Sequence, residues 1–444
     1  MKSLPLLEAS LSPPPKPATE GRPRSWKALF HGRLDGASLI LALWSVPISI
    51  AVSEFFLFIA LLVRIVRLAR GQDHLFFPRA FRFWLLWAGL EIVVLVFSPE
   101  PSLGWSEIRH LLLIGSLFLV MPSLSLAADR RIAWQGIFLT ATLSSLFLIG
   151  DFVSRLFYYR RELAAGGDVG LYLRSGGLLN HWMVYGTVEI LAVAGLLSFW
   201  ALYPEERWRW WPVVAVNGVA ILLSLTRMAW VTCLALFGLD LIWRRSKWLW
   251  ALPLLPVILF AVSPRPIRER VTQSIKPSYY SNLERIEMLR VGWQMIKEHP
   301  LTGVGPGRID KLYTSHLSPH DPVPAYHGHL HNNAVELAAE FGIPVLLAAL
   351  LFAVMLFRDL LKLSKTAQSK EELFLSRAAV LALVGYLVAG LFEYTYGHSL
   401  GLILLSFAVL SPLLPSTPPI AQSSRSMEFP GEVDLAHSRN HASL

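Results

Sequence analysis

The chain has 444 residues, of which 54% are hydrophobic and 16% charged, and its mean hydropathy is +0.48. Ordinary soluble domains carry about 25% charged residues, so this composition excludes a soluble globular protein. The formal net charge of +9 is typical of a chain whose loops face lipid phosphates. A single cysteine, Cys233, excludes an internal disulfide. The composition therefore predicts a protein embedded in a membrane.

Apolar runs long enough to cross a ~30 Å hydrocarbon core recur along the whole chain. Backbone groups in that core must be hydrogen-bonded within the segment, so each run is predicted to be a helix. We expect about twelve spans, at residues 35–50, 52–67, 81–98, 108–126, 133–156, 182–202, 210–226, 229–243, 248–263, 342–360, 377–396 and 399–414. The expected fold class is an all-α polytopic membrane protein with about 12 transmembrane helices and one large outer loop that contains short amphipathic helices.

Lysine and arginine residues in the connecting loops predict the orientation of these spans, because basic loops stay in the cytoplasm. If the spans alternate, six basic groups fall on one side: Arg22, Arg24, Lys27 and Arg33; Arg64, Arg67 and Arg70; Arg130 and Arg131; Arg207 and Arg209; Arg244, Arg245 and Lys247; Arg358, Lys362, Lys365 and Lys370. That side is predicted to be cytoplasmic. Residues 1–34 and 415–444 would then be disordered cytoplasmic tails, on the basis of their polar, Pro- and Ser-rich composition.

The same alternation divides the chain between its tails into three parts. Residues 35–263 would hold spans one to nine, residues 264–341 a large outer loop, and residues 342–414 the last three spans. Arginines also populate the outer side, where the rule disfavours them, and an anionic substrate would explain their presence. Arg227 interrupts an apolar run at the outer junction of spans 210–226 and 229–243. Its planar guanidinium suits a lipid pyrophosphate at the interface.

Residues 282–298 of the outer loop predict an amphipathic helix. Ile286, Leu289, Trp293 and Ile296 recur there at helical spacing, which places them on one face. We expect that apolar face to lie on the outer leaflet or on the helix bundle.

Two short patterns in the outer loop each have two interpretations. The Gly-Val-Gly-Pro-Gly segment at 303–307 allows a phosphate-binding loop, but no strand precedes it, so a simple turn is favoured. His327, His329 and His331 resemble a metal cluster by composition. Alternate histidines converge on one ion only in an extended strand, and no carboxylate or cysteine stands at a defined ligand spacing, so no metal site is predicted.

The end of the outer loop predicts a short capped helix. Asn332 or Asn333 can serve as its N-cap, and Ala334, Leu337, Ala338 and Phe341 would form its apolar face. His331 would then lie at a helix N-terminus, where the helix dipole disfavours the imidazolium form and helps to keep a neutral base.

Three segments in this order resemble the O-antigen ligase and polymerase superfamily of membrane glycosyltransferases (WaaL- and Wzy-like proteins). They are the arginine within LSLT-Arg227-MAW, the Arg285 that precedes HPLTGVGPG, and His331-Asn332-Asn333 followed by Leu337, Glu340 and Gly342. The resemblance covers roughly residues 170–345 and fits a twelve-span plan with one large outer loop.

The resemblance implies an O-antigen ligase of lipopolysaccharide biosynthesis in the bacterial inner membrane, with its active site facing the periplasm. The donor would be undecaprenyl-diphosphate-linked O-antigen and the acceptor a sugar hydroxyl of lipid A–core oligosaccharide. Arg227 and Arg285 would bind the diphosphate and His331 would act as general base, with inversion at the anomeric carbon. The reaction would need no metal and no cofactor. Further residues expected to bind the diphosphate or the acceptor are Arg174, His181, Arg265, Arg290 and Asn332.

Other functions stay open on the sequence alone. An O-antigen polymerase uses the same chemistry with a different acceptor, and a protein O-oligosaccharyltransferase would carry an extra C-terminal region, of which only a short tail after Leu414 is present. A twelve-helix transporter or flippase would show internal repeats and a site near the midplane of the bilayer. Besides the two substrates, the expected partners are membrane lipids, and no nucleic acid is expected.

Overall fold

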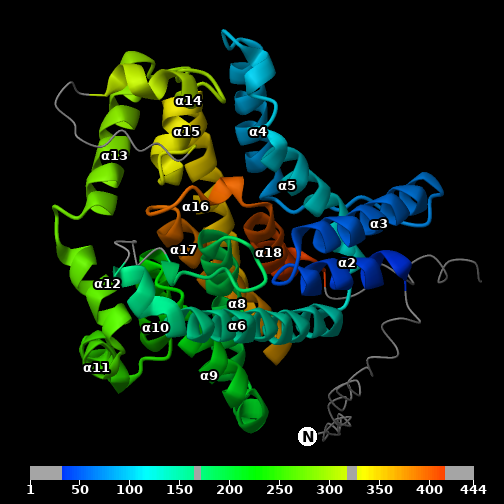
Figure 1. Cartoon of the computed structure of the whole chain (residues 1–444). Helices are drawn as coiled ribbons and strands as arrows, with labels where there is room; N and C mark the ends of the chain where they lie inside the picture. Colours follow the sequence, from blue (N-terminus) through cyan, green and yellow to red (C-terminus); the bar gives the residue numbers. More distant parts are fainter. Residues whose placement is uncertain (1–32, 165–171, 318–327, 416–444) are drawn as a thin grey trace, which may run out of the picture.

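The computed structural model describes residues 33–164, 172–317 and 328–415, and every regular element in these ranges is a helix (Figure 1). The prediction of an all-α fold is therefore confirmed. The predicted tails, residues 1–34 and 415–444, lie almost entirely outside the described residues, and so does His327 of the alternating histidines.

The helices follow one another along the whole described chain. In the first half they are α2 (Leu34–Ser45), α3 (Ile50–Ala69), α4 (Phe81–Val96), α5 (Arg109–Val120), α6 (Ala127–Ala164), α8 (Trp182–Leu202) and α9 (Arg207–Leu223). In the second half they are α10 (Arg227–Trp243), α11 (Leu254–Val262), α12 (Arg265–Ile275), α13 (Tyr280–Glu298), α14 (Ile309–Leu312), α15 (Asn333–Phe341), α16 (Ile343–Thr366), α17 (Lys370–Ala389) and α18 (Ser399–Leu410). Short 3-10 turns connect several of them.

Four described helices are long and apolar enough to cross a membrane: the Ala127–Tyr159 part of α6, and α8, α16 and α17. The predicted number of twelve spans is not confirmed. The predicted span 248–263 is not confirmed as one helix: it consists of a 3-10 turn at Lys247–Ala251 followed by α11, which has only 9 residues. At 1.5 Å per residue, that helix is about 14 Å long, far short of a ~30 Å core.

The centre of the molecule is formed by α8 and α17, which are largely buried within the bundle (Figure 1). Helix α17 packs against α8, α10, α16 and α18. A Cβ atom on Gly385 of α17 would lie 3.0 Å from Ile190 of α8 and 3.1 Å from Leu236 of α10. Because small residues let helix backbones approach closely, this glycine sets the tight packing of α17. The C-terminal end of α17 is thereby held in a fixed place.

A second, smaller core joins α13 to α15 along one edge of the molecule (Figure 1). The predicted amphipathic helix is present, and its apolar residues lie on two faces. Ile296 is buried as expected, whereas Ile286, Leu289 and Trp293 are 59%, 40% and 59% exposed. The buried residues on the neighbouring face include Met288, Val291 and Met295. Met288, Val291 and Met295 thus pack within the protein, whereas Ile286, Leu289 and Trp293 are left on its outside, and their place on the outer leaflet stays a prediction.

Candidate functional site

The loop before α15 is fixed by hydrogen bonds at three consecutive residues. The Leu330 amide donates to Glu336 at 2.5 Å, and the Leu330 side chain is fully buried against α13. His331 follows with a φ of 52°, in the left-handed region that non-glycine residues rarely adopt. The Asn332 side-chain oxygen then caps α15, accepting from the amides of Ala334 and Val335 at 3.0 Å each. The predicted cap is confirmed, and the cap fixes where the strained His331 lies.

A second loop, residues 390–398 between α17 and α18, is bonded to the first. The Asn333 amide donates to the Gly390 carbonyl at 2.8 Å. The Asn333 side chain donates to Thr395 Oγ1 at 2.7 Å and accepts from the Thr395 amide at 2.8 Å. Asn332 Nδ2 also donates to the Leu391 carbonyl at 3.1 Å. Four hydrogen bonds thus join the two loops on either side of Glu393.

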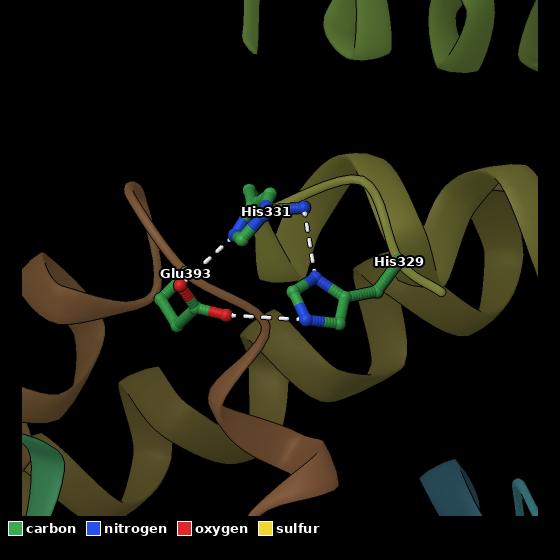
Figure 2. Close-up of side chains that lie close together, drawn as sticks. All are labelled: His329, His331 and Glu393. Carbon is green, nitrogen blue, oxygen red and sulfur yellow. Dashed lines mark hydrogen bonds and ion pairs between the residues drawn. The ribbon is translucent and has the colours of Figure 1, made fainter. Parts of the chain in front are cut away.

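Glu393 contacts two of the alternating histidines (Figure 2). One carboxylate oxygen lies 2.9 Å from His331 Nδ1, and the other lies 3.4 Å from His329 Nε2. The His331 amide donates to His329 Nδ1 at 3.3 Å, which closes the group. The side chain of Glu393 is only 1% exposed. A buried carboxylate therefore bridges both imidazoles.

The charge of Glu393 determines which ring nitrogen of each histidine donates to it. Burial raises the pKa of Glu393, but the hydrogen bond from His331 and the positive charges of the neighbouring histidines lower it to about 2. An ionised carboxylate only accepts hydrogen bonds, so His331 donates from Nδ1, which leaves Nε2 as the ring nitrogen that can accept a proton from a substrate. His329 accepts at Nδ1 and donates from Nε2. His331 is therefore in the tautomer that a general base requires.

These three side chains can also hold a metal ion, because their ligand atoms all lie within 4.8 Å of one another. Two imidazoles and a carboxylate form a common ligand set for zinc and other transition metals. However, the hydrogen bonds between them already satisfy the same atoms. Arg285 also interacts electrostatically with Glu393, so its positive charge opposes the binding of a cation at this group.

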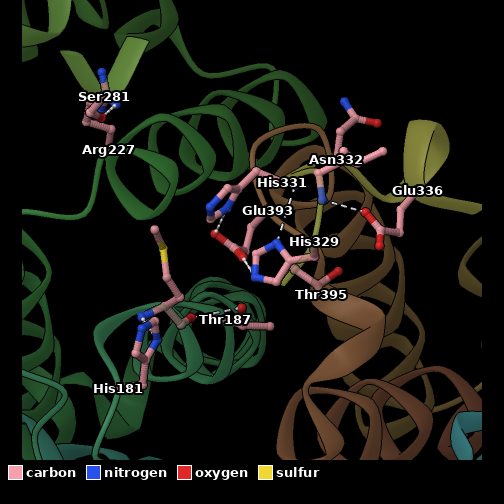
Figure 3. Close-up of polar contacts among 12 residues, drawn as sticks. His181, Thr187, Arg227, Ser281, His329, His331, Asn332, Glu336, Glu393 and Thr395 are labelled. Atoms are coloured by element: carbon pink, nitrogen blue, oxygen red, sulfur yellow. Dashed lines mark hydrogen bonds and ion pairs between the residues drawn. The ribbon is translucent and has the colours of Figure 1, made fainter. Parts of the chain in front are cut away.

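Arg227 is the first residue of α10 and lies two residues after Leu225, which has a φ of 52°. Its guanidinium donates to Ser281 Oγ at 2.8 Å and to Asn282 Oδ1, both at the start of α13. Asn282 in turn donates to the carbonyl of Lys276 at 2.8 Å. Figure 3 shows that Arg227, His181 and the Glu393 group come from separate elements around one region. The partners of Arg227 are neutral, so its charge is not compensated by them.

Electrostatic effects connect the arginines to the Glu393 group. Burial and the positive charges of Arg270, Arg285 and Arg174 together lower the pKa of Arg227 to about 10. Burial also lowers the pKa of Arg285, while Glu393 raises it and Arg270 lowers it. The charge of Arg285 thus interacts both with the Glu393 carboxylate and with Arg270. The predicted residues Arg227, Arg285 and His331 lie in one electrostatic neighbourhood.

Two of the other predicted residues lie near this neighbourhood, before α8. Arg174 is buried, with its guanidinium carbon 5.3 Å from the centre of the Trp182 ring. His181 is the N-cap of α8, and its Nδ1 accepts from the Met183 amide at 3.2 Å. Burial lowers the pKa of His181, Glu393 raises it, and the charges of His331 and Arg174 lower it.

The remaining three predicted residues are engaged elsewhere. Arg265 is 71% exposed and its Nε lies 2.6 Å from Glu269. Arg290 donates to Glu287 on its own helix at 2.9 Å. Asn332 uses its oxygen to cap α15 and its nitrogen to hold the neighbouring loop. These contacts give all three a role in local structure.

The Gly303–Gly307 segment is a turn, as favoured by its sequence. Its three glycines have positive φ angles, and the amides of Val304 and Gly305 donate to carbonyls of α15 at 2.8 and 3.0 Å. The Gly307 amide donates to the Glu340 carboxylate at 2.8 Å. Because these amides point to α15, the turn is not a phosphate-binding loop and instead positions the helix that follows His331.

Sequence reasoning missed Glu393 because the predicted span 377–396 placed it inside the membrane. In the structure α17 ends at Ala389, and Glu393 belongs to the following loop. The run of polar and aromatic residues from Glu393 to His398, directly after Gly390, is the signal that would have ended the span earlier.

Comparison with known proteins gives one family match. Residues 212–350, which are 139 of the 444, match a family model described as O-antigen ligase. The matched segment includes Arg227, Arg285 and His331 and ends before Glu393. No curated protein matches the chain. The match supports membership of this chain in the O-antigen ligase/polymerase family.

Proposed function

We propose that the protein is an O-antigen ligase that transfers O-antigen from undecaprenyl diphosphate to lipid A–core oligosaccharide on the periplasmic face of the bacterial inner membrane. The observation that carries the proposal is a connected set of charges: Arg227 and Arg285 act on each other, and Arg285 acts in turn on Glu393, which is bonded to His331. A diphosphate leaving group needs fixed cations and an attacking hydroxyl needs a base. The orientation rests on the distribution of basic loops along the sequence.

The arginines would act on the leaving group. As the bond between the anomeric carbon and the phosphate oxygen breaks, negative charge grows on the diphosphate. Arg227 and Arg285 are preorganised cations that stabilise this charge without reorganising at the moment of reaction. Since the hydrogen-bond partners of Arg227 are neutral, its charge is available to a substrate.

His331 would act on the acceptor. Its Nε2 takes the proton of the acceptor hydroxyl as that oxygen bonds to the anomeric carbon, and the diphosphate leaves with the electrons of the broken bond. Attack opposite the leaving group inverts the anomeric configuration. The imidazolium that forms is stabilised by the ionised Glu393 at Nδ1, 2.9 Å away.

A transfer assay with the purified full-length protein tests the proposal. The protein is incubated with undecaprenyl-diphosphate-linked O-antigen and lipid A–core, and the products are separated on a gel. A ladder of glycan-bearing lipid A–core is the expected result. Lengthening of the glycan on the lipid donor alone would make the protein a polymerase. Transfer to neither acceptor would favour a transporter.

Glu393→Gln is expected to lower transfer at least about tenfold, because the amide keeps the hydrogen bond but not the charge that stabilises the imidazolium. The pKa of Glu393 is depressed from 4.5 to about 2, so its contribution to stability is present above pH 4.5 and is lost as the pH falls toward 2. The variant should therefore also unfold at a lower temperature at pH 7.

Glu100→Gln is the matched control for Glu393→Gln, because Glu100 is a carboxylate paired with Lys311 at the surface. Steady-state transfer rates of both variants are compared with the wild type. Equal losses in the two variants, or full activity of Glu393→Gln, would remove Glu393 from the proposed mechanism.

Treatment with EDTA is expected to leave the transfer rate unchanged, since the proposed steps use only protein side chains. The rate is measured after dialysis against EDTA and again after zinc is added back. Loss of activity that zinc restores in the wild type but not in His329→Ala would instead show that His329, His331 and Glu393 hold a catalytic metal.

A further inference from the structure

Arg270 of α12 is a buried arginine without an acidic partner among the described residues. Only 4% of the surface of Arg270 is exposed. Its Nε donates to the Leu225 carbonyl at 3.4 Å, and one terminal nitrogen donates to the Tyr279 hydroxyl at 3.4 Å. Its guanidinium carbon also lies 5.8 Å from the centre of the Tyr279 ring. All of these partners are neutral, and both hydrogen bonds are long.

Other buried arginines of the described chain show what such a residue ordinarily has. Arg64 lies 2.6 Å from Asp73, and Arg377 lies 3.0 Å from Asp240. Arg130 donates to several backbone carbonyls, including that of Leu414 at 3.3 Å. A guanidinium stays charged in proteins, and burying a charge is unfavourable unless it is paired. Arg270 therefore has neither the acidic partner of Arg64 and Arg377 nor the several carbonyls that hold Arg130.

Arg270 lies where it would share an anion with Arg227 and Arg285. Among the arginines that lower the pKa of Arg227, Arg270 has the largest effect. Its positive charge also lowers the pKa of Arg285. The Leu225 carbonyl that it contacts is two residues before Arg227 in the chain. Arg270 donates to Tyr279, and Arg227 donates to Ser281 and Asn282, so both guanidinium groups are held by the same short segment at the start of α13. Among the described residues, neither of these two arginines has an acidic hydrogen-bond partner.

We infer that Arg270 is a third diphosphate-binding residue of this site, in addition to Arg227 and Arg285. The inference rests on the proposed function and names the ligand as a polyprenyl diphosphate ester. Such an ester carries at least two negative charges spread over two phosphoryl groups, which three fixed guanidinium groups can neutralise together. A monophosphate ester presents one phosphoryl group and needs fewer of them. Arg270 therefore contributes to discrimination between a diphosphate and a monophosphate.

Arg268 supplies a matched control for Arg270. It lies two residues earlier on the same helix, carries the same charge and is exposed. Removing it changes the net charge of the protein by the same amount without touching the buried cluster. Arg270→Lys is the conservative variant, which keeps the charge and loses the planar fork.

The test measures binding of farnesyl diphosphate and farnesyl monophosphate to the full-length protein in detergent by titration calorimetry. Arg270→Ala is expected to weaken diphosphate binding about tenfold or more, as the loss of a charge-assisted hydrogen bond implies. Monophosphate binding should weaken less, and Arg270→Lys should be intermediate. Arg268→Ala should bind both esters as the wild type does. Thermal unfolding of each variant shows that the binding protein is folded.

Three results would overturn the inference. One is diphosphate binding by folded Arg270→Lys and Arg270→Ala that equals the wild type. A second is wild-type protein that binds no farnesyl diphosphate. The third is an equal loss in Arg268→Ala, which would show a general charge effect. Failure of the proposed function would give a different result. If the wild type binds the diphosphate through Arg270 but transfers no glycan, the anion-binding site is supported and the transferase activity is contradicted.

Discussion

His331→Ala is expected to lower glycan transfer about 100-fold or more while the affinity for the lipid donor stays within about twofold. Transfer of the acceptor's proton depends on Nε2 of this ring, whose tautomer is fixed by Glu393. The donor diphosphate, in contrast, is bound by the arginines. Single-turnover transfer and direct donor binding, measured on the same preparation, separate the two effects.

His316→Ala provides the comparison, because His316 is another histidine of the segment between α13 and α15 and is bonded to Glu298 at 3.0 Å. It should transfer glycan as the wild type does. If His331→Ala instead lost donor binding and transfer in equal proportion, His331 would be a binding residue and the base would have to be another group.

Arg227→Ala and Arg285→Ala are each expected to lower transfer about 100- to 1,000-fold, the range found for removal of one preorganised donor at a developing charge. Both should also weaken donor binding, unlike His331→Ala. Arg227→Lys should recover little, because a lysine cannot reach both Ser281 and Asn282 with a planar fork. The measurements are transfer rate and donor affinity in detergent.

Folding is monitored for these arginine variants because Arg227 joins α10 to the start of α13. Removing a repulsive charge from the cluster should leave thermal stability nearly unchanged or raise it, as the pKa of Arg227 is lowered by its surroundings. Folded variants with normal transfer would show that the diphosphate binds elsewhere.

Local sequence rules predicted those parts of the site that depend on local structure. The Asn332 cap and α15 follow from one capping residue and one apolar face. The position of Arg227 between two helices follows from a charge that interrupts an apolar run. The Gly303–Gly307 turn follows from its glycines, three of which have positive φ.

The parts that were missed depend on contacts between distant segments. Glu393 reaches His331 across 62 positions in the chain, and no local pattern encodes that pairing. Arg270 looks like any charged residue on an amphipathic helix until its burial is known. The packed face of α13 was not predicted, because Met288, Val291 and Met295 lie outside the apolar stripe identified in the sequence, and only the partner helix α15 shows that they are buried. Sequence periodicity shows that a helix has an apolar face, but it does not show which neighbouring element packs on that face.

The most direct measurement is glycan transfer by the purified chain alone in proteoliposomes, with release of undecaprenyl diphosphate followed in the same reaction. If Arg227, Arg285 and His331 form one transfer centre, lipid A–core should gain glycan as undecaprenyl diphosphate is released, in equal amounts, and both signals should disappear in Arg285→Ala and His331→Ala. Folded wild-type protein that binds the donor and moves it across the bilayer without releasing undecaprenyl diphosphate would contradict a transferase.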